Sequence, residues 1–400
     1  MKDQFAVAVV GCLFAAAAVI AQERPTPDRP APKPPPRRGY LLPEDRAIGH
    51  FLVREKGSKA GEVWEDLVEA RGAVLTPPER EVKLAFNESA VADVKLLADF
   101  KAESLAGLSL RRLTIKNDDL AFIRHLKGLR ELDLSGTGIT NEGLKHLEPL
   151  KELELLNLSG TKITDAGLSE VVRLEKLMIL DLPSQITPDG LVRLSERPTL
   201  ASLSLRGNPN LTATDALRGL VALKALARLD LAESTLTDAA GEALGSCKRL
   251  EDVDLSRTGV GDGTARALSS SRILTHLNLT RTAVTDGGVG ALASATSLET
   301  LLLGGTKITD GALEAVCSLP LLKRVSLAGT AVTDIGAARL SRLAGTLEDL
   351  SLQDVKVTDA VCGDLERLTG LRRLVLRGTG LTSACRERLR RQLPKCAIVN

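Results

Sequence analysis

The stretch LELLNLSGTKITDAGLSEVVRLEK, residues 153–176, is the unit that most of this chain repeats. Its first half alternates apolar and polar residues with the period of a strand. The apolar residues of its second half recur at the spacing of a helix: Leu168, Val171, Val172 and Leu174. One unit therefore predicts one strand and one helix. Because such a unit cannot enclose its own apolar face, it becomes stable only when neighbouring units stack on it.

Copies of this unit follow one another in phase, 23 to 26 residues apart and mostly 24. Their first leucines are Leu129, Leu153, Leu177, Leu200, Leu226, Leu250, Leu274, Leu298, Leu322, Leu347 and Leu371. A degenerate copy around residues 84–91 and a shortened one around residues 110–120 precede them. The pattern predicts a solenoid of about thirteen turns, which grows by addition and can remain one elongated domain.

The consensus of the copies, Leu-x-x-Leu-x-Leu-Ser-Gly-Thr-x-Ile-Thr-Asp-x-Gly-Leu, resembles the leucine-rich repeat over residues 82–400. Within that family the chain is similar to the cysteine-containing, ribonuclease-inhibitor-like type, found in F-box-linked adaptors and in exported bacterial proteins. In that type Thr often replaces the Asn that follows the strand, as at Thr137, Thr161, Thr258, Thr282, Thr306, Thr330 and Thr379, with Asn208 as the single Asn. The resemblance implies an α/β fold: a right-handed horseshoe with a parallel concave sheet and convex helices.

The first 43 residues differ in composition from the repeats. Residues 1–21 carry Lys2, then an apolar run from Phe5 to Ile20, which predicts a signal peptide cleaved after Ala21. The alternatives are an uncleaved membrane anchor, for which the run is short, and lipidation at Cys12, which most of the apolar run follows. Residues 22–43 hold eight of the seventeen prolines and predict an extended linker.

Residues 44–79 change period again and are predicted to form a helical N-terminal cap before the repeat domain of residues 80–400. The apolar residues Ile48, Phe51 and Leu52 suit a short helix, and a strand is expected near residues 73–75. A cap is needed because an open solenoid end exposes apolar surface and an unpaired strand edge. Trp64, the only tryptophan, is expected to plug that cap rather than to serve as a ligand platform.

Most predicted strands are followed by Thr-Asp, as at Thr285-Asp286 and Thr309-Asp310. We interpret these pairs as helix N-caps, because side-chain oxygens there accept hydrogen bonds from free amides of the first helical turn. They recur once per unit and are therefore structural rather than catalytic or metal-binding. Two copies lack the Asp and differ in length, so local kinks are expected at residues 183–190 and 206–215.

A helix and a final short strand, residues 384–400, are predicted to cap the C-terminal end. Five cysteines remain outside the signal, with no Cys-x-x-Cys spacing and no nearby His, which disfavours a zinc site. Buried core thiols are the default expectation, and Cys385 with Cys396 is the pairing we expect if one forms.

Charge and motif content exclude several classes of function. The balance of 53 basic and 51 acidic residues gives no overall attraction to nucleic acid or an anionic membrane, so neither is an expected partner. Membrane contact is expected only through an uncleaved signal or a lipid anchor. The four histidines fall in unrelated positions, and no catalytic constellation, phosphate loop or cofactor motif is present in the sequence. We expect a protein that is not an enzyme and has no cofactor.

The outward positions of the strands supply candidate ligand contacts, because solenoid curvature creates an extended binding surface. The candidates on the concave face are Asp181, Arg228, Asp230, Asp252, Asp254, Arg257, His276, Asn278, Arg281 and Leu302. An ordinary solvated strand face is the alternative. No Phe, Trp or Tyr follows Phe122, so aromatic anchors are absent from most of the array.

Three functions remain open at this point. The first is an exported module, in the periplasm, cell envelope or outside the cell, that binds a protein or peptide on the concave sheet. The second is a structural scaffold of the envelope or surface without a dedicated ligand. The third, an F-box-like ubiquitin-ligase adaptor, is disfavoured because a signal and a proline-rich segment occupy the N-terminal region where an F-box would be needed.

Overall fold

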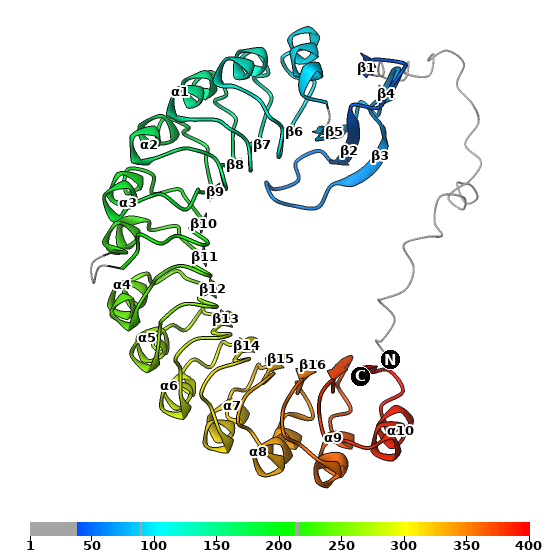
Figure 1. The fold of residues 1–400 in the computed structure, drawn as a ribbon, viewed down its shortest axis with the longest axis vertical. Coiled ribbons are helices and arrows are strands. Elements are labelled where there is room, and N and C mark those ends of the chain that lie inside the picture. The colour runs from blue at the N-terminus through cyan, green and yellow to red at the C-terminus, as the bar shows by residue number, and fades with distance from the viewer. Residues whose placement is uncertain (1–37, 89, 213–215) are drawn as a thin grey trace, which may run out of the picture. The chain divides into compact units, whose positions relative to one another are not determined.

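The computed structural model describes residues 38–88, 90–212 and 216–400. The predicted signal and most of the predicted linker, residues 1–37, lie outside the described residues. Strands β5 to β18 form a parallel array in sequence order, and the antiparallel strands β2 and β3 extend it to a 16-stranded sheet. Figure 1 shows the strands side by side on one side of the array and the helices on the other. The solenoid fold is thus confirmed, and β5 to β17 supply the thirteen predicted turns.

The sheet elements have the following bounds: β1 Arg38–Leu41, β2 Gly49–Glu55, β3 Glu65–Glu69, β4 Ala73–Thr76, β5 Arg80–Phe86, β6 Gly107–Ser109, β7 Glu131–Asp133, β8 Leu155–Asn157, β9 Ile179–Asp181, β10 Ser202–Ser204, β11 Arg228–Asp230, β12 Asp252–Asp254, β13 His276–Asn278, β14 Thr300–Leu302, β15 Arg324–Ser326, β16 Asp349–Ser351, β17 Arg373–Val375 and β18 Ala397–Val399.

The α-helices are short: α1 Asn141–Leu144, α2 Leu168–Val171, α3 Pro188–Leu194, α4 Gly241–Ser246, α5 Asp262–Leu268, α6 Asp286–Leu292, α7 Leu313–Cys317, α8 Asp334–Arg339, α9 Cys362–Glu366 and α10 Ser383–Gln392. Turns of 3-10 helix complete many units: η1 Val91–Asp99, η2 Asn117–Ile123, η3 Lys145–Leu147, η4 Asp165–Gly167, η5 Arg218–Ala222, η6 Asp238–Ala240, η7 Asp310–Ala312, η8 Leu340–Leu343 and η9 Asp359–Val361. None of the helices among the described residues is long and apolar enough to span a bilayer.

One apolar core runs through the whole array. The central residue of each strand points inward and pairs in register with its neighbours, as Leu156 pairs with Leu180 and Leu180 with Leu203. These three side chains are buried, and the core cluster continues without a break from Tyr40 to Leu393. Because consecutive units share this core, burial in one unit depends on the presence of the next.

The Thr that follows seven of the strands is tied to its own turn, and six of these seven threonines are buried. The hydroxyl of Thr282 donates to the carbonyl oxygen of Leu279 at 2.7 Å, and the other threonines at this position do the same. The amide of Asn208 instead donates to the carbonyl oxygen of Ile186 in the preceding unit, at 2.8 Å. The Thr hydroxyl thus forms a hydrogen bond within its own unit, whereas the longer amide of Asn208 reaches the preceding unit.

Most of the Asp residues at the first helical position have a different role from the one we predicted. Asp310 accepts hydrogen bonds from the main-chain N–H and the hydroxyl of Thr333 in the next unit, at 2.7 and 2.6 Å. The same contact joins Asp165 to Thr187, Asp262 to Thr285, Asp286 to Thr309, Asp334 to Thr358 and Asp359 to Thr382. Several threonines do cap their helices, but the carboxylates clamp one unit to the next.

The predicted helical cap of residues 44–79 is wrong, because this segment forms strands. In β2 the side chains of Phe51 and Val53 point into the core while their neighbours face out, which is the alternation of a strand. Ile48 lies just before the strand, so its spacing to Phe51 mimicked a helical pattern. The predicted linker also ends earlier than expected, since β1 begins at Arg38, pairs with β4 and carries the buried Tyr40.

The C-terminal end holds a disulfide that differs from the predicted pairing. Cys362 in α9 bonds Cys385 in α10, whereas Cys396 is free. Cys362 and Cys385 occupy the same layer of adjacent units with their Cα atoms 5.9 Å apart, a normal disulfide separation. Cys247 and Cys317 are also free, and burial raises the pKa of each thiol to about 11.

The two irregular units keep the sheet intact. Ser202 of β10 pairs in register with Ile179 of β9 and with Arg228 of β11, so the length changes are absorbed outside the strands. Pro188 takes the place of the clamp Asp in the first irregular unit. The local kinks expected there stay a prediction.

The clamp predicts a measurable stability contribution. Asp310→Ala should lower the free energy of unfolding by about 1–2 kcal/mol, because two hydrogen bonds between units are lost and the Thr333 amide loses its partner. Urea unfolding followed by circular dichroism measures this. Asp189→Ala is the control: the Asp189 side chain is 83% exposed and its ion pair with Arg218 spans 3.0 Å at the surface, so its loss should cost about 0.5 kcal/mol or less. Equal losses would contradict the clamp.

Candidate ligand-binding face

The outward side chains of the parallel strands form two rows on the exposed sheet face, which we predict to be concave. The first row contains Arg228, Asp252 and His276, whose Cα atoms pair in register. The second row contains Asp230, Asp254 and Asn278, two residues further along the same strands. Asp181 and Leu302 belong to the second row on β9 and β14. The structure therefore brings eight of the ten predicted residues together on β9 and β11 to β14.

The remaining two candidates, Arg257 and Arg281, lie in the turns that follow the strands. Their φ angles are 58° and 57°, in the left-handed region where six of the units place a glycine such as Gly207. Arg257 Nε lies 4.0 Å from a carboxylate oxygen of Glu233, so this arginine pairs with a turn residue rather than with the aspartates. Both guanidinium groups border the face and remain exposed.

Most Asp and Asn residues of the second row have a structural task. The carboxylate of Asp254 accepts the main-chain N–H of Ser256 at 2.8 Å, which holds the turn after the strand. Asp133, Asn157, Asp230 and Asn278 accept the amide two residues further on in the same way. These side chains are therefore more than a solvated strand face. The second carboxylate oxygen of each Asp accepts from a neighbouring unit: Ser109 donates to Asp133, Ser204 to Asp230 and Asn278 to Asp254.

Asp181 is the exception in this row. The residue two positions further on is Pro183, which has no N–H to donate. Among the described residues no hydrogen bond or ion pair reaches the Asp181 carboxylate. Burial, and then the nearby charges of Asp230 and Asp133, raise its pKa to about 6. The pKa of Asp230 is also raised, first by burial and then by the charge of Asp254. The Ala232 amide and Arg206 act in the opposite direction and lower this pKa.

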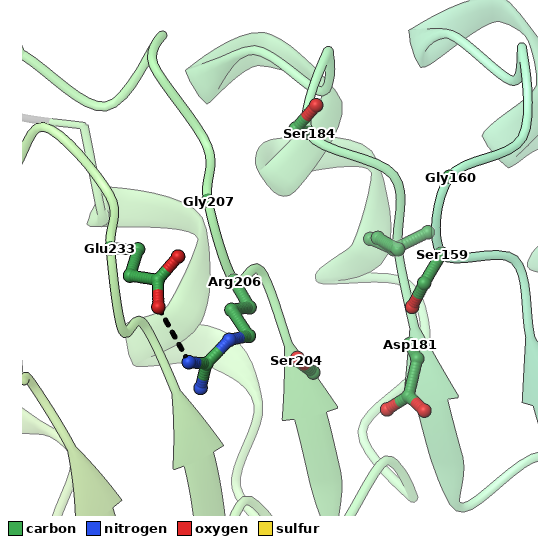
Figure 2. A pocket seen from close by; sticks show the side chains of 9 residues that line it. Ser159, Gly160, Asp181, Ser184, Ser204, Arg206, Gly207 and Glu233 are labelled. Atoms are coloured by element: carbon green, nitrogen blue, oxygen red, sulfur yellow. Dashed lines mark hydrogen bonds and ion pairs between the residues drawn. The ribbon is translucent and has the colours of Figure 1, made fainter. Parts of the chain in front are cut away.

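A cavity of about 520 Å³ opens beside Asp181, between the turns that follow β8 to β11. Figure 2 shows Asp181 and Ser204 at the ends of their strands, with Ser159 and Ser184 in the neighbouring turns. The turn after Asp181 is short: Thr187 follows six residues later, whereas Thr164 follows Asn157 by seven. The turn that is one residue shorter lies at the cavity, whose lining includes Leu182 and Ser184.

Arg206 and Glu233 form the other wall of this cavity and were not among the predicted residues. Arg206 donates to Glu233 at 2.7 Å, and its guanidinium lies 3.8 Å from a carboxylate oxygen of Asp230 (Figure 2). Within the described part of the chain, neither Arg228 nor Arg257 makes such a contact with Asp230. In the sequence, the signal for this pair is a charged residue at a turn position, as with Arg206 two residues after Ser204.

Residues 56–64, which we call the strap, lie over the sheet face between β2 and β3. Trp64 does not plug the core as predicted: its indole N–H donates to Glu131 at 2.8 Å, and its ring stacks under the Arg54 guanidinium with 4.1 Å to the ring centre. A Cβ placed on Gly61 would lie 3.1 Å from Ile179 Cδ1. The strap thus reaches β9, two residues from Asp181, and Figure 1 shows this segment extending from the cap toward β9.

In the described part of the chain, the histidines and the possible metal ligands do not gather into a catalytic or metal site. His50 contacts Asp66 at 3.1 Å, His125 contacts the carbonyl oxygen of Phe100, and His276 contacts the hydroxyl of Thr275. These histidines lie in separate units. No cluster of three or more His, Cys, Asp or Glu side chains in the described ranges could hold a metal ion. The arrangement on the face suits the binding of a cationic group.

Comparisons with known proteins agree with this architecture. Residues 125–147, 152–172 and 270–293 match the family model described as leucine-rich repeat. An internalin from Listeria monocytogenes is similar in structure, with a TM-score of 0.57 and 22% identity, over 80% of this chain and 86% of that one. A leucine-rich repeat protein from Leptospira interrogans has a TM-score of 0.51 and 18% identity, over 80% and 89%.

A third solved structure, a complex of TLR13 with ssRNA13, is similar over 70% of this chain and 43% of that one, with a TM-score of 0.51 and 19% identity. No curated protein matches the chain in sequence. At these identities the structures establish the fold alone. The chain has the leucine-rich repeat fold.

The unpartnered carboxylate predicts a pH-dependent cost in stability. Because the pKa of Asp181 is raised to about 6 in the fold, its charged form is disfavoured, and stability falls as pH rises from about 4 to above 6. Asp181→Asn should raise the free energy of unfolding at pH 7.5 by about 1 kcal/mol, discounted for solvent access, and by much less at pH 4.

Urea unfolding at both pH values tests this expectation. Asp254→Asn is the matched control, because Asp254 accepts hydrogen bonds from Ser256 and Asn278 and should gain nothing when neutralised. A stabilisation by Asp181→Asn that is equal at pH 4 and pH 7.5 would show that the charge of Asp181 is not its cause.

Proposed function

We propose that the chain is a non-enzymatic binding module that holds a basic, extended segment of a protein partner on the sheet face of β9 to β12. The observation that carries this proposal is the Asp181 carboxylate, which lies beside a cavity without a donor in the described chain. A lysine or arginine of a partner would supply that donor. The neighbouring carboxylates of Asp230 and Asp254 would add electrostatic attraction over a longer distance, because their second oxygens already accept from Ser204 at 3.4 Å and Asn278 at 3.1 Å.

The leucine-rich repeat fold supports a binding role over a catalytic one. Its sheet presents many side chains in register at a spacing of about 5 Å, which suits an extended polypeptide better than a small molecule. We place the chain in the cysteine-containing type because a buried Thr with the same hydrogen bond follows most strands.

Nucleic acid is a less suitable ligand for this surface. TLR13 was solved with an RNA, but the face described above carries four aspartates at β9, β11 and β12, which repel phosphate. The other candidate, a scaffold without a ligand, is favoured by the structural tasks of the second-row carboxylates. It does not account for Asp181, whose burial without a partner costs stability.

Binding of a basic probe tests the proposal. Fluorescein-labelled nona-arginine should bind the full chain, and Asp230→Asn with Asp254→Asn should weaken its affinity by about tenfold, equivalent to about 1.4 kcal/mol. The loss should shrink at high salt, where screening is stronger. For the unchanged chain, affinity should also fall between pH 7.5 and pH 5, as Asp181 becomes protonated through its pKa of about 6. Fluorescence anisotropy measures each affinity.

The matched control carries Asp189→Asn with Asp364→Asn, two carboxylates in the helical layer with the same total change in charge. This variant should bind the probe nearly as well as the unchanged chain. Equal losses in the two double variants would assign the binding to net charge, and self-association without peptide binding would favour the scaffold.

We also propose that the protein is exported. The apolar run of residues 5–20 and the proline-rich segment after it are typical of an exported precursor, and the Cys362–Cys385 disulfide suits an oxidising compartment. Sequencing the N-terminus of the protein purified from its own cells should give Gln22 as the first residue. An intact Met1 or Lys2 in the soluble cytosolic fraction would contradict export.

A further inference from the structure

The contacts of the strap resemble those of a bound peptide. Two of its carbonyl oxygens accept hydrogen bonds, Ser58 from Arg130 at 2.9 Å and Lys59 from Arg54 at 3.0 Å. Its amides donate to carboxylates, Gly61 to Glu131 at 3.0 Å and Gly57 to Glu81 at 3.4 Å. The sheet face of β5 to β8 is therefore already equipped to bind an extended main chain, with donors and acceptors in fixed positions.

The side chains under the strap tip are unusual for this face. The first outward row is polar from β10 to β17 but apolar on β8 and β9: its members are Leu155, Ile179, Ser202, Arg228, Asp252, His276, Thr300, Arg324, Asp349 and Arg373. A Cβ at Gly61 would meet Ile179 Cδ1 at 3.1 Å and Leu155 Cδ1 at 3.8 Å. The strap thus covers the two aliphatic side chains that this row offers.

The strap is held mainly by polar contacts, together with the half-buried ring of Trp64 on the Arg54 guanidinium. Arg54 is 3% exposed and bonds Glu81 and Glu131, while Arg130 bonds Glu81 and Glu154. Buried ion pairs contribute little net stability, because desolvation opposes their attraction. The five residues of β3, which follow the strap, are all exposed, as are Gly57, Glu62 and Val63. Segments with few apolar contacts are the first to open locally.

We propose that the strap is a displaceable cover that occupies a second peptide-binding surface on β5 to β9. When it lifts, an extended segment of a partner polypeptide takes its place, with its main chain on Arg54, Arg130 and Glu131 and an aliphatic or aromatic side chain on Leu155 and Ile179. This surface adjoins the Asp181 cavity, since Ile179 and Asp181 lie on one strand. The inference rests on the proposed function only for its assumption of a polypeptide ligand.

Two glycines allow a matched pair of variants on the strap. Gly57 and Gly61 have φ angles of 84° and 81°, which Asp tolerates better than most residues, so the backbone strain is similar at both. An Asp at position 61 lies against Ile179 and Leu155, whereas position 57 faces open space. Gly61→Asp should therefore lift the strap and Gly57→Asp should not.

The opening is measured on the full chain without any ligand. Amide hydrogen exchange of residues 56–64 should be at least tenfold faster than that of β7 and β8 in the unchanged chain, and faster again in Gly61→Asp. Trp64 is the only tryptophan, so its fluorescence and its quenching by acrylamide report strap opening directly. Strap amides that exchange as slowly as those of β7 and β8 would overturn the proposal.

Occupancy of the surface is measured with a labelled peptide that has the sequence of residues 55–65, EKGSKAGEVWE. It should bind Gly61→Asp about tenfold more tightly than the unchanged chain or Gly57→Asp, in which the strap competes. Equal affinity for all three chains, or binding to none, would overturn the peptide-binding surface. Asp230→Asn with Asp254→Asn should leave these results unchanged, so a failure here is distinct from a failure of the proposed function.

Discussion

The units of this solenoid satisfy only some of their hydrogen bonds internally and depend on their neighbours for the rest, and the whole structure depends on that constraint. The amide and hydroxyl of Thr333 are bonded only because Asp310 of the preceding unit accepts from them. The strand amides are likewise bonded across units, as Leu279 N donates to the carbonyl oxygen of Leu302. Both ends of such an array leave unpaired groups. The β2 to β5 strands close one end, and α10 with β18, tied by the Cys362–Cys385 disulfide, closes the other.

The features that the sequence predicted well are those that recur. Each repeat gives an independent example of the strand, the inward leucines and the buried Thr, so errors at one copy are corrected by the others. The features that it missed occur once. The β2 strand places Phe51 three residues from Ile48, Trp64 bonds a carboxylate two units away in space, and Cys362 meets Cys385 only when adjacent helices stack. Single contacts of that kind depend on tertiary geometry, which a repeat pattern does not contain.

The candidate face shows the same division. The row that joins Asp230, Asp254 and Asn278 could be predicted from the register of the repeats. The lack of a donor for Asp181 could also be predicted from the sequence. Pro183 has no N–H at the position where five other units donate an amide to the Asp or Asn, and the turn after Asp181 is one residue short. Arg206 and Glu233 required the structure, since they lie outside the strands and meet across the turns of β10 and β11. Their ion pair leaves Asp230 only partly neutralised at 3.8 Å.

The strap tip and the cavity meet successive outward residues of β9, and this proximity has a physical consequence. Ile179 supports the strap tip, and Asp181, two residues further on, lines the cavity on the same face of the same strand. About 6–7 Å of extended chain separates two such side chains. A partner segment that reaches from one to the other would meet aliphatic side chains first and a carboxylate next. Because Ile179 and Asp181 lie in this order along β9, a ligand that contacts both would carry an apolar side chain and a basic side chain in the matching order.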